Sequence, residues 1–153
     1  MSTYHANVKW ARKKSEAYID NQYSRSHTWT FESGLVIPAS ASVHIVQPPY
    51  SVAENIDPEE AFVASLSSCH MLFFLSIAAK NNFIVDEYRD KAIGTLDKNA
   101  AGHFYMSEVT LHPEVIFTGD KQPTLENIKN IHHQSHNQCF IANSVITKVE
   151  III

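Results

Sequence analysis

Several parts of the chain alternate between apolar and polar residues, or are rich in β-branched and aromatic residues, and these patterns predict β-strands. Glu32-Ser33-Gly34 separates two such segments and predicts the turn of a β-hairpin. The turn-rich sequence DKNAAG separates two others, whereas VQPPYSVAEN is expected to be a loop because its two prolines cannot lie in a central strand. The expected strands are residues 4–10, 27–31, 35–37, near 88–96, near 103–118 and the final stretch SVITKVEIII.

The sequence DPEEAFVASLSSCHMLFFLSIAAK, residues 57–80, predicts a long helix that is apolar on most of its circumference. Asp57 is the expected N-cap, Pro58 the first helical residue, and Glu60 the partner of Asp57 in a capping box. We expect the helix to end near Asn81-Asn82, after about 35 Å at ~1.5 Å per residue. One sheet of a 153-residue monomer covers such a helix poorly, so the pattern favours a dimer.

The sequence TLENIKNIHHQSHNQ predicts a second helix, capped by Thr124. One side of this helix is expected to carry Leu125, Ile128, Ile131 or His132, and Ser135. The resulting order is hairpin, long helix, strands, helix and strand, which favours an α+β fold over a parallel α/β sheet. We expect one domain over residues 1–153.

Composition and charge narrow the functional classes. The chain is 44% hydrophobic with a net charge of −4, and its basic residues are scattered, so we expect no nucleic-acid partner. Residues 61–79 carry no formal charge, but Ser and His residues interrupt them, which argues against a membrane span. The N-terminus is polar and lacks the apolar core of a signal peptide. We therefore expect a soluble, cytoplasmic protein.

Cys69 and Cys139 are the only two cysteines, and they leave two interpretations open. Each could be a small buried apolar residue, because free cysteine is often part of a core. Alternatively, one thiol could attack a peroxide and become a sulfenic acid, which the other thiol converts into a disulfide. The second interpretation needs Cα atoms within ~4.4–6.8 Å of each other, which their spacing in the sequence does not establish.

Two regions of the chain resemble the signature regions of the OsmC/Ohr family, the osmotically inducible and organic-hydroperoxide-resistance proteins. They are DPEEAFVASLSSCHMLFFLSIAA and IHHQSHNQCFIANSVITKVEI. The shared features are the Pro-Glu start of the central helix, a cysteine ten residues after Glu59, and a second helix that ends in Cys followed by Asn. YSRSHTWTFESGLVIPAS also resembles the N-terminal hairpin of the family. Two departures are SSCHM around the first cysteine and Phe140 after the second, where the hydroperoxide-resistance branch has proline.

The resemblance implies an OsmC-like α+β fold in which antiparallel sheets wrap around long central helices in an intertwined homodimer. It implies thiol-dependent reduction of organic hydroperoxides to alcohols, with no cofactor or metal and with a dithiol reductant such as a lipoyl-bearing protein. By the same resemblance, Cys69 is the peroxidatic cysteine and Cys139 the resolving one. Arg25 matches the arginine that activates the thiol, and Glu59 the glutamate that holds this arginine.

The ordinary pKa of a thiol agrees with a need for a cation such as Arg25 to stabilise the thiolate of Cys69. A thiol with a pKa near 8.5 is mostly protonated at neutral pH, and Cys69 is too far from the start of its helix to gain much from the helix dipole. A cation from elsewhere in the fold is therefore needed, and a guanidinium is always charged. Glu59 lies about 15 Å from Cys69 along the same helix, so it is expected to serve the thiol site of the partner chain.

The histidines and aromatic residues leave two alternatives open. His132, His136 and Cys139 follow helical spacing, and with His70 they could bind a metal or line the rim of the thiol pocket. Apolar residues of the long helix are expected in the core or as walls for the alkyl part of a peroxide: Phe62, Met71, Phe73 and Phe74. The alternative to a peroxidase is thus a dimeric stress protein that binds a metal or a small hydrophobic ligand without turnover.

Overall fold

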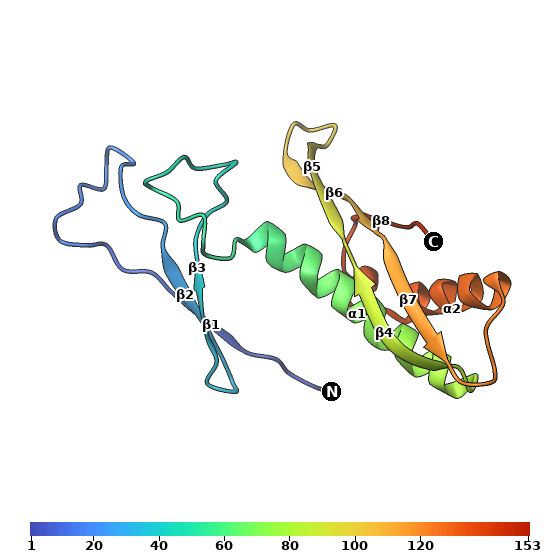
Figure 1. Cartoon of the computed structure of the whole chain (residues 1–153). Coiled ribbons are helices and arrows are strands. Elements are labelled where there is room, and N and C mark those ends of the chain that lie inside the picture. The colour runs from blue at the N-terminus through green and yellow to red at the C-terminus, as the bar shows by residue number, and fades with distance from the viewer. The chain divides into compact units, whose positions relative to one another are not determined.

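The computed structural model describes all residues, 1–153, and the chain forms two compact units, Met1–Ala61 and Phe62–Ile153 (Figure 1). Its mixture of helices and mostly antiparallel sheets confirms the α+β class, whereas the single domain over 1–153 stays a prediction. The elements are β1 (Ala6–Lys9), β2 (His27–Phe31), β3 (Val36–Ala39), α1 (Pro58–Lys80), β4 (Ile84–Asp90), β5 (Ile93–Lys98), β6 (Phe104–Leu111), β7 (Pro113–Thr118), α2 (Leu125–Gln138), the 3-10 helix η1 (Ala142–Ser144) and β8 (Lys148–Ile151).

The first unit is built on the predicted hairpin. Strands β1, β2 and β3 form an antiparallel sheet in this order. The turn between β2 and β3 is the predicted one, and Gly34 adopts φ = 82°, a conformation that side chains disfavour. The segment VQPPYSVAEN is a loop, as expected.

Helix α1 begins with the predicted capping box. The Glu60 backbone N–H donates to Asp57 Oδ1 at 2.8 Å, and the Asp57 N–H donates to Glu60 Oε2 at 3.4 Å. These two bonds satisfy amide groups that have no partner within the helix. The helix ends at Lys80, and Asn82 then takes a left-handed conformation with φ = 60°. The expected bounds of this helix are therefore confirmed.

The second unit contains two sheets, β4–β7 and β5–β6–β8. The segments near 88–96 and 103–118, each expected to be one strand, are each two strands. The ladder of β4 with β7 ends where Asp90 pairs with Pro113. The ladder of β5 with β6 begins where Ile93 pairs with Thr110. At the break, the backbone N–H of His112 donates to the side-chain oxygen Oδ1 of Asp90 at 2.7 Å instead of to a backbone carbonyl of a neighbouring strand. Strand β8 pairs with β6 in parallel, so this sheet is mixed rather than purely antiparallel.

Helix α1 contributes to two cores within the second unit. Toward its N-terminal half, Leu66 packs with Val109 and Leu111 of β6. Toward its C-terminal end, Phe74 and its neighbours pack with Ile131 of α2 and with side chains of β4 and β7. Helix α1 is thus the element that connects both sheets and α2.

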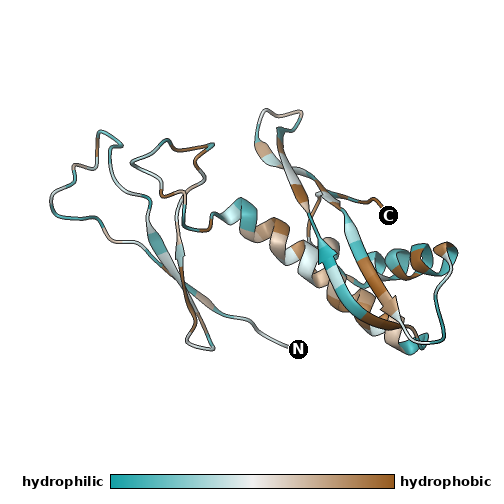
Figure 2. Cartoon of the chain, viewed as in Figure 1, coloured by the Kyte–Doolittle hydropathy of each residue, from teal (hydrophilic) through white to brown (hydrophobic).

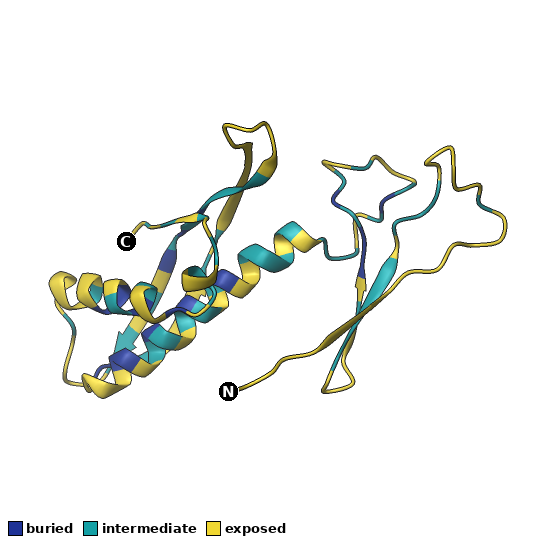
Figure 3. Cartoon of the chain, turned by 180° about the vertical axis from the view of Figure 1, so that it is seen from behind, coloured by how far each residue is buried: buried dark blue, intermediate teal, exposed yellow.

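Much of α1 is nevertheless uncovered within one chain. Figure 2 shows apolar residues along most of the helix, and Figure 3 shows exposed positions between the buried ones. Its buried residues are Leu66, His70, Phe74, Ile77 and Ala78, whereas the side chain of Leu72 is 60% exposed. A helix that is apolar on most of its circumference is normally buried on nearly every side, and within one chain α1 is not. The homodimer remains a prediction, since one chain does not test it.

Helix α2 begins at the predicted cap. Thr124 accepts a hydrogen bond from the Asn127 backbone N–H at 3.2 Å, and the Asn127 side chain accepts from the Thr124 N–H at 2.9 Å. The buried side carries Ile131, His132 and Ser135, as expected. Leu125 was expected on this side but is 59% exposed, and the other residues at the start of the helix, 124–127, are also exposed.

Candidate thiol site

The two cysteines, distant in the sequence, lie close to each other in the second unit. Cys69 lies near the middle of α1 and is partly exposed, and Cys139 is the C-cap of α2 and is fully buried. The thiol of Cys69 is within hydrogen-bonding reach of the Cys139 thiol. Both are free thiols. The two thiols are thus close enough to interact, while their capacity to form a disulfide and the roles of the two residues stay predictions.

The local structure holds Cys139 firmly. Its backbone N–H makes the last helical bond, to the carbonyl of Ser135 at 2.9 Å, and its extended backbone with ψ = 112° ends α2. Its sulfur accepts a hydrogen bond from the Ala142 backbone N–H at 3.4 Å. Burial, followed by the hydrogen bond with Cys69, raises the pKa of the Cys139 thiol to about 11. Cys139 is therefore protonated at neutral pH in the reduced protein.

An aromatic pair joins the two segments that carry the cysteines. Phe73 is one helical turn after Cys69, and Phe140 directly follows Cys139. Their rings meet edge to face, with planes at 89° and centres 5.1 Å apart. Phe140 is 71% exposed, so the pair forms an apolar surface that solvent reaches. An alkyl group that approached Cys69 here would find an apolar partner.

A pair of buried histidines joins the same two helices. His70 Nε2 lies 2.9 Å from His132 Nδ1, and the two ring planes are nearly parallel, 8° apart. Phe74 packs against the His132 ring at a centre-to-centre distance of 4.4 Å. The remaining ring nitrogens, His70 Nδ1 and His132 Nε2, are buried without a hydrogen-bond partner. The neutral pair therefore carries two unsatisfied polar atoms in the core.

Burial disfavours the charged form of both rings. It lowers the pKa of His70 to about 4, with a further contribution from His136 and an opposing one from Asp90. Burial and the neighbouring His70 lower the pKa of His132 to about 4. Asp90 also accepts a short hydrogen bond from Ser67 Oγ of α1. Tyr88, in the same strand as Asp90, is half-buried, and this burial, with the charge of Asp90, raises the pKa of its hydroxyl. Both histidines are neutral at pH 7.

The metal-binding alternative finds no site of suitable geometry. No group of three or more His, Cys, Asp or Glu side chains is placed to hold a metal ion. His70 and His132 instead use one nitrogen each to bind each other. His136 Nδ1 is buried and has no hydrogen-bond partner, and His136 belongs to no group of side chains that could hold a metal ion. Sequence reasoning expected these histidines near the thiols but missed the direct pairing, which no spacing in one helix could reveal.

Arg25 lies in the first unit, in the loop before β2, where its guanidinium is bound by its own loop. Nη1 donates to the Asn21 carbonyl at 2.9 Å and to the Tyr23 carbonyl, and Nη2 donates to Asn21 Oδ1 at 2.7 Å. The guanidinium carbon lies 3.8 Å from the centre of the Tyr23 ring. Arg25 forms no ion pair within the chain.

Glu59 lies in the first turn of α1, ten residues before Cys69. At ~1.5 Å per residue this is about 15 Å along one continuous helix, as expected. Its carboxylate makes no ion pair within the chain. A pairing of Glu59 with Arg25 therefore stays a prediction.

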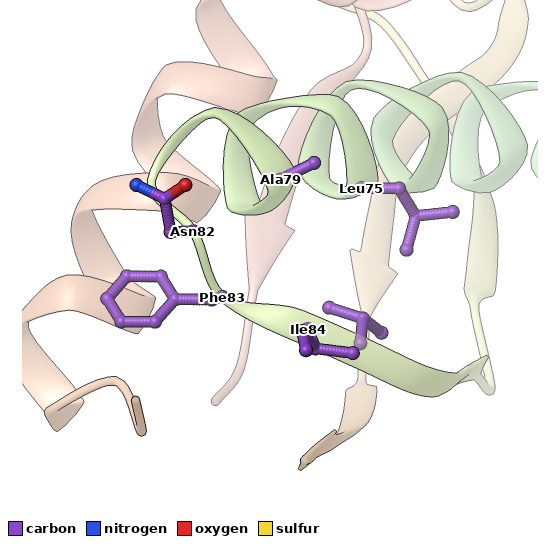
Figure 4. Close-up of a pocket in the computed structure, with 6 residues that line it drawn as sticks. Leu75, Ala79, Asn82, Phe83 and Ile84 are labelled. Carbon is purple, nitrogen blue, oxygen red and sulfur yellow. The ribbon is translucent and has the colours of Figure 1, made fainter. Parts of the chain in front are cut away.

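An apolar pocket of about 550 Å³ lies at the C-terminal end of α1 (Figure 4). Its walls come from the last turns of α1 and from the beginning of β4. They are Leu75, Ala79, Asn82, Phe83, Ile84 and Val85. Neither cysteine contributes to it, so this pocket is separate from the thiol pair.

Solved structures with the same fold cover almost the whole chain. An OsmC-like protein of unknown function from Vibrio cholerae is 56% identical, with a TM-score of 0.98 over 100% of this chain and 99% of that one. An organic hydroperoxide resistance protein from Elizabethkingia anophelis is 16% identical, with a TM-score of 0.72 over 99% and 93%. OhrB of Bacillus subtilis, also an organic hydroperoxide resistance protein, is 17% identical, with a TM-score of 0.66 over 99% and 98%. The two distant likenesses establish the fold alone. None of the curated proteins matches the chain.

The family described as OsmC-like protein matches residues 52–153, which include α1, both cysteines and the whole second unit. This match covers about two thirds of the chain and agrees with the 56% identity to the Vibrio cholerae protein. The resemblance seen in the two cysteine regions is thereby confirmed: the chain belongs to the OsmC-like protein family.

Proposed function

We propose that this protein is a thiol-dependent peroxidase that reduces organic hydroperoxides to alcohols. The proximity of the thiols of Cys69 and Cys139 carries the proposal, because a peroxidatic and a resolving cysteine have to reach each other. Relatives of the same fold are named organic hydroperoxide resistance proteins, which supports this reaction.

The different environments of the two sulfurs support an order of events. Cys69 is partly exposed and can meet a peroxide, whereas Cys139 is buried, and its raised pKa keeps it protonated. The Cys69 thiolate attacks the terminal, hydroxyl oxygen of the hydroperoxide, the O–O bond breaks, and the alkoxide leaves and takes up a proton to become the alcohol. The Cys69 sulfenic acid then reacts with the Cys139 thiol to give a disulfide and water. An external dithiol returns both residues to the thiol form.

We further propose that Arg25 stabilises the Cys69 thiolate and that Glu59 binds this arginine. A guanidinium with free N–H donors is suited to hold both a thiolate and a peroxide oxygen. The distance between Glu59 and Cys69 along α1 favours an active site shared between two chains, in which Glu59 serves the thiols of its partner. The uncovered apolar surface of α1, which includes Leu72, supports the homodimer that this arrangement needs.

We propose a cytoplasmic location, where reductants keep free thiols reduced. Helix α1 is long and apolar enough to cross a membrane by length and composition. The core helix of a soluble protein meets the same criterion, and α1 packs against both sheets of the second unit. We propose neither a membrane nor a nucleic acid as a partner.

The proposed reaction is tested by mixing the reduced protein with cumene hydroperoxide and a dithiol and following the loss of peroxide. Wild type should consume peroxide catalytically, and Cys69→Ser should abolish consumption. Cys139→Ser should consume one equivalent and accumulate the sulfenic acid of Cys69. Ser76→Ala, at an exposed position of the same helix, serves as the control. Full activity of Cys69→Ser would contradict the assignment of the nucleophile.

The pocket at the end of α1 favours one alternative, the binding of a small hydrophobic ligand without turnover. The same assay separates the two functions. A ligand-binding protein would leave the peroxide unreduced, and its affinity for an apolar probe would not change in Cys69→Ser.

A further inference from the structure

Two of the contacts that join α1 to the α2 segment involve neighbouring residues of α1. Cys69 lies close to Cys139, the C-cap of α2, and His70 Nε2 lies 2.9 Å from His132 Nδ1. His132 precedes Cys139 by about two helical turns, so both residues lie along one side of α2. The imidazole pair therefore joins the two helices in the region where the thiols lie close to each other.

The imidazole pair satisfies only half of its own hydrogen-bonding groups. One ring donates and the other accepts, so in either tautomer one outer ring nitrogen carries a hydrogen and the other is an acceptor. These outer nitrogens, His70 Nδ1 and His132 Nε2, are buried without a partner, and the two residues are only 1% and 2% exposed. Two apolar side chains would join the helices without this cost. Stability alone does not account for the pair.

A hydrogen bond restrains the helices in a way that apolar contacts do not, because it depends on direction as well as distance. The ring planes of His70 and His132 are 8° apart, with centres separated by 5.2 Å. Phe74 packs against His132 at a centre-to-centre distance of 4.4 Å and limits the movement of this ring. A single buried polar contact can fix the register of two packed helices, as a buried Asn does in coiled coils.

We propose that His70 and His132 are positioning residues, whose hydrogen bond holds α1 and α2 in the register at which Cys69 and Cys139 can form a disulfide. The inference rests on the proposed function, which requires that disulfide. The sulfur atoms of a disulfide are only ~2.05 Å apart, so a small displacement of one helix along the other decides whether the bond can form. Helices that are already ordered also lose less conformational entropy when the bond forms, which favours the disulfide.

The test compares two substitutions of the same histidine. His132→Leu keeps an apolar side chain of similar size but removes the hydrogen bond to His70. His132→Asn keeps a hydrogen-bonding group near the position of Nδ1 but leaves part of the space of the ring empty. His133→Leu, at the exposed neighbouring position, is the control.

Each protein is equilibrated at pH 7.5 with mixtures of reduced and oxidised glutathione. After alkylation of the free thiols, mass spectrometry gives the fraction of protein with the Cys69–Cys139 disulfide.

We expect His132→Leu to shift this equilibrium about three- to tenfold towards the two thiols, a factor that corresponds to the loss of one hydrogen bond. His132→Asn and His133→Leu should stay within about twofold of wild type. If the ring acted only through packing, the order would be reversed, because Leu fills the space of the ring better than Asn does.

A double variant guards against a loss of folding, because His132→Leu leaves both nitrogens of His70 unpartnered in the core. His70→Leu with His132→Leu removes all four ring nitrogens, so the reduced double variant should be at least as resistant to urea as reduced His132→Leu. Its disulfide equilibrium should nevertheless be shifted as far as that of His132→Leu.

Equal shifts in His132→Leu and His132→Asn would overturn the inference, as would a larger shift in His132→Asn or an unchanged equilibrium in the double variant. Each of these results leaves the proposed function intact if wild type forms the Cys69–Cys139 disulfide. If neither cumene hydroperoxide nor oxidised glutathione produces this disulfide in wild type, the inference and the proposed function fall together.

Discussion

His70 Nε2 and His132 Nδ1 lie 2.9 Å apart, so a hydrogen bond between two buried imidazoles connects helices α1 and α2. One ring has to donate and the other has to accept. A pair with one extra proton can keep this bond, but a pair with two extra protons has no acceptor left. Helix α1 carries Cys69, and α2 ends at Cys139. The histidine pair therefore joins the same two helices that bring the thiols close to each other.

The free energy of unfolding should therefore fall in acid. The pKa of each histidine is about 4 in the folded protein, below the ordinary value of 6.5, so the unfolded chain binds protons first as the pH falls. The contribution of the pair is fully present above pH 6.5 and is lost between pH 6.5 and about 4. The loss should amount to about a few kcal/mol for the pair as a whole. Urea unfolding at pH 7.5 and pH 5 measures the part of this loss that occurs above pH 5.

A matched variant separates this pair from the carboxylates, which also titrate in acid. His132→Gln removes one buried ring and should reduce the difference in stability between pH 7.5 and pH 5. His133→Gln, one residue along the same helix but exposed, should leave this difference unchanged. An equal pH dependence in both variants would show that the buried pair does not cause it.

Phe140→Ala should change the choice of peroxide more than the stability of the protein. Phe140 is 71% exposed, so its removal costs little packing, but its edge-to-face contact with Phe73 beside the thiols is lost. We expect kcat/KM for cumene hydroperoxide to fall by about threefold or more, with little change for hydrogen peroxide, since only the former has a bulky apolar group to bind.

The control for this prediction is Leu125→Ala, which removes an exposed apolar side chain at the opposite end of α2. It should alter neither value of kcat/KM. A uniform decrease for both peroxides in Phe140→Ala would instead indicate damage to the thiol pair itself.

Mixed dimers test whether Glu59 serves the partner chain. Cys69→Ser and Glu59→Gln should each be poorly active alone. In a mixed dimer, one site combines the intact Cys69 of one chain with the intact Glu59 of the other. Random reassembly of equal amounts should then restore about a quarter of the wild-type activity, because half of the dimers each regain one of two sites. Activity no higher than the average of the two variants would place Glu59 at the thiols of its own chain.

Gly94→Ala should destabilise the second unit, because a Cβ at Gly94 of β5 would overlap Val63 of α1 and Met106 of β6. Overpacking of this kind costs about 1–3 kcal/mol, and the flexible end of Met106 can relieve only part of it. The free energy of unfolding in urea is the measurement. In a Val63→Ala background, which makes room on the helix, Gly94→Ala should cost less. An equal cost in both backgrounds would mean that α1 is not the obstacle.

Local signals in the sequence predicted the elements well where a few neighbouring residues decide the structure. Asp57, Pro58 and Glu60 marked the start of α1, and Thr124 marked that of α2, because a cap is formed within one turn. Glu32-Ser33-Gly34 predicted the hairpin for the same reason. The strands near 88–96 and 103–118 are each two strands in the structure, and at the break the His112 N–H donates to Asp90 Oδ1, a partner that no local pattern reveals.

The sequence by itself determined the caps, the hairpin, the α+β class and, through its likeness to a known family, the two cysteines as a candidate pair. Only the tertiary structure decided that Cys69 and Cys139 lie close to each other, that His70 pairs with His132, and that Asn21 binds Arg25 twice. The physical reason is the separation in the sequence between the residues that interact. Caps and turns are set by bonds between near neighbours, whereas a thiol pair or a buried imidazole pair depends on how two helices pack, to which the whole unit contributes.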